Sequence, residues 1–183
     1  MLEGKMEKLI NEIRKKNDEW GDSHRMEATG DISEQILMID EKTYRPLSQQ
    51  MRDYYTIVST WENGLLGKTS YPPSQLKELY EQDDVREVIN LIAENYRPVP
   101  PSDNSDWNRT AIFAKEQGGL GVTFYWWKNT NDDEPAIISI SGGDVKIFAD
   151  LLEYLKYLAY NEFSEAGDAI YSDLERERGT LSD

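Results

Sequence analysis

The chain has 183 residues, of which 38% are hydrophobic, and its 35 acidic against 20 basic residues give a formal net charge of −15. This length and composition allow one domain with a buried core. The negative charge argues against nucleic acid and anionic membrane surfaces as partners, because both are negative themselves, and it favours a basic protein. The absence of cysteine excludes disulfides and thiolate metal sites and is typical of the reducing cytoplasm.

The start of the chain carries no targeting signal that we can identify. Residues 1–8 alternate charge and contain no apolar core of the kind that a signal peptide has. No apolar run in the chain approaches the ~20 residues that a membrane helix requires. We therefore expect a soluble, cytoplasmic protein that does not contact a membrane.

The N-terminal part of the chain is predicted to be mostly helical. Apolar residues recur at helical spacing from residue 3 to residue 20 and predict an amphipathic helix that ends near Gly21. Residues 21–31 are polar and aperiodic, which predicts a loop. Residues 36–39 fit either a short helix or a strand.

Three more helices are predicted after this stretch. Ser48 stands where an N-cap would, and the helix after it is predicted to end at Asn63-Gly. Tyr71-Pro-Pro opens another helix, since proline is tolerated before or within a first turn. A third helix is predicted over Asp84–Tyr96, and the stretch 98–106 reads as a connector rich in Pro, Ser and Asp.

The hydrophobic period changes to two near residue 110, which predicts strands. The expected strands are Thr110–Ala114, Val122–Trp127 and Ala136–Ile140, and bulky residues on both faces of the second make it a central strand. A helix over Asp144–Tyr160 is predicted to close the sheet, because its apolar stripe is wide enough to cover it. We therefore predict an α+β fold with N-terminal helices, an antiparallel sheet and a closing C-terminal helix.

Residues 1–160 are predicted to form a single α+β domain, followed by an acidic tail. The segment 161–183 carries far more acidic than basic residues. We expect it to be either a short, loosely held helix or partly disordered.

No residue pattern indicates a catalyst, a metal site or a cofactor. The chain has a single histidine, His24, in a polar stretch and no cysteine, so a nucleophilic triad lacks its parts. Asp132, Asp133 and Glu134 could imitate a metal cluster, but neighbours on a tight turn point apart. One alternative stays open: an acidic carbohydrate hydrolase that uses paired carboxylates, with exposed Trp and Tyr side chains stacking on sugar rings.

Several segments together resemble the SUKH superfamily, over roughly Asp40 to Leu158. Its members begin with helices that carry a proline-bearing entry and an Asn-Gly or Gly-Gly turn, to which Arg45-Pro-Leu and Trp61-Glu-Asn-Gly are similar. They continue with an antiparallel hairpin whose acidic turn ends in proline, similar to residues 132–135. They finish with a helix that residues 144–160 resemble.

The resemblance implies a binding module rather than an enzyme, because many family members are immunity proteins against bacterial toxins. The partner it implies is a basic toxin domain, plausibly a nuclease, bound through acidic residues with an aromatic anchor. The expected partner-binding residues are therefore the acids of the hairpin turn, a neighbouring aromatic and a second acidic cluster in the connector: Asp132, Asp133, Glu134, Trp127, Asp103 and Asp106.

Overall fold

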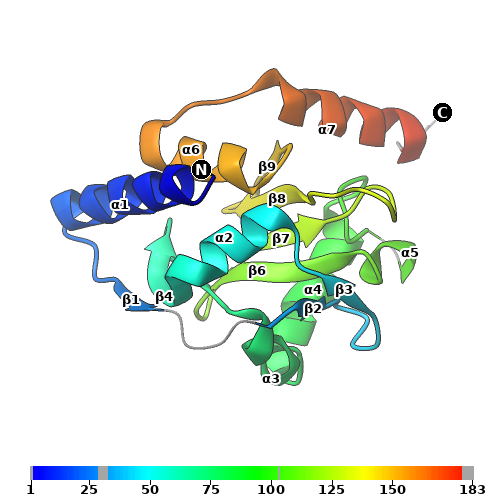
Figure 1. Cartoon of the computed structure of the whole chain (residues 1–183). Coiled ribbons are helices and arrows are strands. Elements are labelled where there is room, and N and C mark those ends of the chain that lie inside the picture. The colour runs from blue at the N-terminus through cyan, green and yellow to red at the C-terminus, as the bar shows by residue number, and fades with distance from the viewer. Residues whose placement is uncertain (1, 29–32, 103, 179–183) are drawn as a thin grey trace.

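The computed structural model describes residues 2–28, 33–102 and 104–178. Its centre is a seven-stranded antiparallel sheet in which each strand pairs with the strand before it in that sheet (Figure 1). The strands, in spatial order, are β1 (Arg25–Ala28), β4 (Val58–Leu65), β5 (Lys68–Ser70), β6 (Thr110–Glu116), β7 (Val122–Trp126), β8 (Ala136–Ser141) and β9 (Asp144–Phe148). A separate two-stranded sheet pairs β2 (Gln35–Leu37) with β3 (Tyr44–Pro46).

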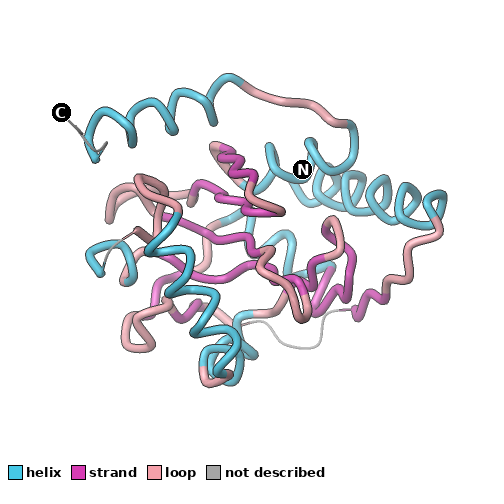
Figure 2. The backbone as a smooth tube through the Cα atoms, turned by 180° about the vertical axis from the view of Figure 1, so that it is seen from behind, coloured by secondary structure: helices cyan, strands magenta, loops and turns pink. Residues whose placement is uncertain are grey.

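Helices lie on both sides of the large sheet. Helices α1 (Leu2–Trp20), α2 (Gln49–Ile57) and α6 (Leu151–Tyr160) pack against one another and cover one face (Figure 1). The short helix η1 (Pro73–Gln75), with α3 (Leu76–Tyr80), α4 (Asp83–Asn95) and α5 (Asn104–Trp107), lies toward the other side (Figure 2). The predicted α+β fold with N-terminal helix, antiparallel sheet and C-terminal helix is confirmed.

The core lies mainly between the sheet and the three covering helices. Strand β7 is buried along its whole length, as expected for a central strand. Phe113 of β6 makes ring contacts with Tyr54 of α2 and Tyr154 of α6, with centroids 5.1 and 6.2 Å apart. These aromatic contacts join helices that are a hundred residues apart in the chain, and they fix both on one sheet face.

The predicted closing helix over residues 144–160 begins later than expected. Gly142 and Gly143 adopt positive φ angles of 57° and 91°, which is the conformation that a two-residue hairpin turn requires. Residues 144–148 therefore turn back as β9 and pair with β8. Asp150 then caps α6 by accepting a hydrogen bond from the Glu153 backbone N–H at 2.9 Å.

The helix predicted to end at Asn63-Gly was wrong over its second half. Helix α2 ends at Ile57, and Val58–Leu65 is strand β4. Val58 and Trp61 happen to continue the helical spacing, but this β-branched and aromatic stretch also suits a strand, and pairing with β1 and β5 decides the outcome. The chain turns at Leu66-Gly67, both with positive φ.

Two further segments differ from the prediction. Strand β1 lies within the stretch predicted as loop, and the connector contains the short helix α5. Neither segment has an apolar period of its own, so only tertiary contacts define them. For residues 161–183 a short, loosely held helix or partial disorder was expected, and the described part forms helix α7 (Glu165–Arg178), which packs along the edge strand β9 and buries Leu174.

Candidate partner-binding site

The three predicted acids of the hairpin turn lie beside a hollow at one end of the sheet. The turn joins β7 to β8, and the hollow, of about 580 Å³, opens between this turn and the segment that runs from β3 into α2. Asp132, Asp133 and Glu134 line one side of it, and Arg45 and Arg52 line the other. The hollow therefore has mixed charge with an excess of one carboxylate.

The three carboxylates have different roles. Asp132 holds the turn itself, because its carboxylate accepts hydrogen bonds from the Asn129 backbone N–H at 2.7 Å and side-chain amide at 3.2 Å. Glu134 accepts a hydrogen bond from the backbone N–H of Gln50 at 3.1 Å. Asp133 is exposed and has no hydrogen bond or ion pair with any described residue. Of the three, Asp133 is the carboxylate that a partner can reach without breaking an internal contact.

Glu134 completes the N-terminus of helix α2. Ser48 Oγ accepts a hydrogen bond from the Met51 backbone N–H at 3.3 Å, and Glu134 accepts one from the Gln50 N–H. Two of the free N–H donors of the first turn are therefore satisfied. Burial raises the pKa of Glu134, although its hydrogen bonds act in the opposite direction. Its second oxygen is buried and has no partner among the described residues.

Trp127 does not form an exposed anchor, which corrects the prediction. Only 2% of the residue is exposed. The Arg45 guanidinium lies 4.9 Å from its ring centroid and donates to the Thr130 carbonyl at 2.6 Å, so Arg45 covers the indole from outside. Trp127 thus lines the hollow while exposing almost none of its own surface.

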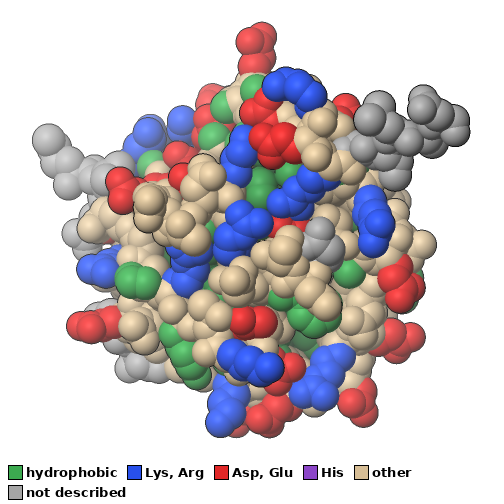
Figure 3. All heavy atoms as spheres, turned by 90° about the vertical axis from the view of Figure 1, so that its right-hand side faces the viewer, with side chains coloured by type: hydrophobic (Ala, Val, Ile, Leu, Met, Phe, Trp, Pro, Cys, Tyr) green, Lys and Arg blue, Asp and Glu red, His purple; other side chains and the backbone are tan. Residues whose placement is uncertain are grey.

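Asp106 does not belong to an exposed acidic cluster either. Its side chain is fully buried, where it accepts hydrogen bonds from Arg178 and Arg109. Asp103, the other residue predicted for this cluster, lies outside the described residues. The face at the right of Figure 1 accordingly presents Lys and Arg side chains near its middle and acids around them (Figure 3).

A second hollow, of about 480 Å³, was not predicted from the sequence. It opens over β1, β4, β5 and the end of β6, against the corner formed by η1, α3 and the start of α4. Glu27, Glu62 and Asp84 line it together with Tyr71. These residues come from four separate segments, so no local motif joins them. Within β4, the polar residues Thr60 and Glu62 lie on one side of the strand and are a local signal for the hollow. This signal was not recognised, because the segment was predicted to be helix.

His24 has a structural role and is not a solvated loop residue. Its imidazole accepts a hydrogen bond from Trp61 Nε1 at 3.1 Å and contacts Asp18 at 3.0 Å, and 9% of the side chain is exposed. Both ring nitrogens are thus engaged in holding β4 to the end of α1.

Within the described part of the chain, no group of three or more acidic or histidine side chains is arranged to hold a metal ion. In the same ranges, no helix is both long and apolar enough to cross a membrane. No family model, curated protein or solved structure matches the chain.

Proposed function

We propose that this chain is an acidic binding protein that acts in the cytoplasm on a basic protein, in the manner of a SUKH-type immunity protein that neutralises a toxin by direct contact. The observation that carries the proposal is Asp133. It stands at the rim of a hollow, exposed and unpaired with any described residue, in a chain whose formal net charge is −15. An unpaired surface carboxylate in a strongly negative field attracts a Lys or Arg of a basic partner.

The expected mechanism is electrostatic recognition. The net charge accelerates the encounter with a basic surface and disfavours acidic or nucleic-acid competitors. Hydrogen bonds of Asp132 within the turn and of Glu134 to α2 hold the backbone on both sides of Asp133. A turn that is already ordered lowers the entropy that binding costs.

The test is the association rate of a Lys variant at Asp133 with a basic protein captured from the source cell and then purified. We expect Asp133→Lys to slow association about tenfold at low salt and to weaken its salt dependence. Glu7→Lys is the matched control, because Glu7 is exposed on helix α1 far along the chain and the change in net charge is identical.

Equal association rates for the two variants would contradict the proposal. So would the absence of any basic partner together with turnover of an oligosaccharide by the purified chain, which is the result expected of the paired-carboxylate hydrolase. Loss of turnover on neutralising two neighbouring carboxylates would then identify the catalytic pair.

A further inference from the structure

The hollow over β1, β4 and β5 has a polar floor made by the sheet itself. Thr60, Thr69 and Lys115 are all buried there, with the Lys115 ammonium bonded to Asp84 at 3.3 Å and to the Glu116 carbonyl at 3.0 Å. Thr69 and Lys115 are direct cross-strand partners of β5 and β6. A sheet face that carries hydroxyl and charged groups instead of apolar residues offers little apolar surface on which a helix of the same chain could pack.

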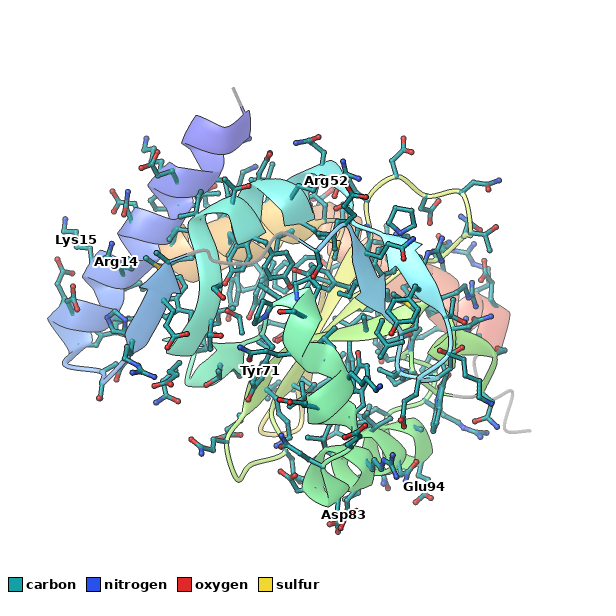
Figure 4. All side chains as sticks on the ribbon, turned by 60° about the horizontal axis from the view of Figure 1, so that its bottom comes forward. Arg14, Lys15, Arg52, Tyr71, Asp83 and Glu94 are labelled. Atoms are coloured by element: carbon teal, nitrogen blue, oxygen red, sulfur yellow. The ribbon has the colours of Figure 1, made fainter. Side chains whose placement is uncertain are left out.

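Carboxylates converge on this hollow from two sides. Glu27 and Glu62 come from the strands, whereas Asp84 comes from the first turn of α4. Tyr71 lies between the strands and the α3–α4 corner (Figure 4). Burial raises the pKa of Tyr71, and the negative charges of Asp84 and then of Glu62 raise it further. Both acids therefore interact with the Tyr71 hydroxyl.

The chain itself shows what kind of group these carboxylates accept. Arg25 is directly opposite Glu62 in the β1–β4 pair, and its guanidinium lies 2.7 Å from the Glu62 carboxylate and 3.3 Å from that of Glu27. About two thirds of the Arg25 side chain is exposed, and Arg25 does not line the hollow. Asp84 is paired with Lys115, but it is also more than half exposed.

We propose that this hollow is the docking site for an arginine or lysine side chain of the basic partner. The inference rests on the proposed function and adds the place where a partner side chain inserts. The incoming cation would lie between Glu62 and Asp84 against the ring of Tyr71, where charge-assisted hydrogen bonds and a cation–π contact combine. Thr60, Thr69 and Gln75 supply further oxygens at the hollow.

The test uses a probe that does not depend on knowing the partner. N-acetyl-arginine amide is titrated into the full-length, ¹⁵N-labelled chain, with the uncharged N-acetyl-glutamine amide as the control ligand. We expect the arginine probe alone to shift the amide signals of Thr60, Glu62 and Thr69. The double variant Glu62→Gln, Asp84→Asn should weaken the probe's binding about tenfold, which corresponds to the loss of ~1.4 kcal/mol.

A second double variant, Glu7→Gln with Glu175→Gln, removes the same charge at two exposed positions outside the hollow and should leave the probe's binding unchanged. A spectrum with native dispersion for both variants shows that each is folded. The inference is overturned if the arginine shifts gather on the β7–β8 turn, if they spread over all acidic surfaces, or if the Glu62, Asp84 variant binds the probe as well as the original chain does.

The same variants separate the two proposals. If Asp133→Lys slows association with the basic partner while Glu62→Gln, Asp84→Asn leaves its affinity unchanged, the docking site fails and the proposed function stands. If the probe binds at the hollow but no basic protein binds the chain, the proposed function fails, and the hollow is a cation site without the partner assigned to it here. Loss of partner affinity in both variants supports both.

Discussion

Arg178 and Asp106 form a two-pronged ion pair that joins the C-terminal end of helix α7 to the segment before β6. Arg178 Nη1 lies 2.6 Å from Asp106 Oδ2 and Nη2 lies 2.8 Å from Oδ1. Asp106 is fully buried and also accepts from Arg109 at 3.1 Å. The Arg178 guanidinium is 5.7 Å from the centroid of the Trp126 ring. Helix α7 is therefore attached at its C-terminal end by a charged group whose partner is in the core.

Replacing Arg178 by Ala should destabilise the protein and release α7. Removing one partner of a buried ion pair costs about 3 to 5 kcal/mol, but Arg109 still neutralises Asp106, so we expect about 2 kcal/mol. The measurements are urea unfolding and hydrogen exchange of the α7 amides, which should become less protected.

Arg176→Ala is the matched control for Arg178. Arg176 is two residues away on the same helix and pairs with Asp173 while 74% of its side chain is exposed. Exposed pairs of this kind contribute less than about 1 kcal/mol. Similar losses for the two variants would show that Asp106 does not hold the helix.

Gly167→Ala should also displace α7, for a steric reason. A Cβ at Gly167 would lie 1.8 Å from the Ile147 carbonyl oxygen of β9, so the helix cannot keep its position against the edge strand. We expect a loss of about 1 to 3 kcal/mol, typical of overpacking, measured by chemical unfolding. Gly4→Ala in α1 has open space around it and should instead raise stability by up to about 1 kcal/mol. A stable Gly167→Ala variant would mean that α7 does not touch β9 there.

Leu155→Ala should cost about 2 to 5 kcal/mol, because Leu155 is fully buried in α6 and its loss leaves a cavity. The control is Leu120→Ala in the β6–β7 turn, where the side chain is largely exposed and the expected change is within about 0.5 kcal/mol. A difference of less than about 0.5 kcal/mol between the two variants would show that α6 is not docked on the sheet.

Lys68 should make stability increase with pH. Its ammonium is buried, forms no ion pair with any described residue, and donates to Thr123 at 3.1 Å and to Ser139 at 2.9 Å. Burial lowers the pKa of Lys68 from 10.5 to about 8. Above pH 8 the folded chain releases this proton before the unfolded chain does, so the unfolded state binds more protons and the free energy of unfolding rises.

Lys68→Met should abolish this effect, because methionine does not titrate. Thr123 and Ser139 can still bond to each other at 3.3 Å in the variant. The stability of the original chain relative to the variant should rise by about 2 kcal/mol between about pH 7.5 and about pH 9.5. Urea unfolding at both pH values measures it. Parallel pH profiles for the two proteins would mean that the Lys68 amine is solvated.

Three strands of the sheet could be predicted because they have a local signal. Strands β6, β7 and β8 alternate or are uniformly apolar between turn residues, and the structure places all three next to one another in the predicted antiparallel order. Strands β1 and β9 could not be predicted in the same way. Both lie at the edges of the sheet. Strand β1 has four mostly exposed residues, and the apolar residues of β9 fell within the helix predicted over residues 144–160.

The acidic turn beside the candidate site was predicted in position, but the contacts of its side chains were not. The sequence located the acidic turn of residues 132–134 correctly, since turn residues and a proline mark it. It could not separate Asp133 from its neighbours, because the contacts of Asp132 and Glu134 are side-chain hydrogen bonds, one of them to a helix 84 residues away. It also could not show the second hollow, whose acids come from segments that meet only in the folded sheet.

The sequence by itself determined the fold class, the central strands, the apolar face of α6 and the negative field around the molecule. These properties depend on hydrophobic period and net charge, which are set by residue order and composition alone. Only the tertiary structure decided that Trp127 and Asp106 are buried and that Asp133 is free. The exposure of a side chain depends on which distant residue lies over it, and here Arg45 covers one of them and Arg178 the other.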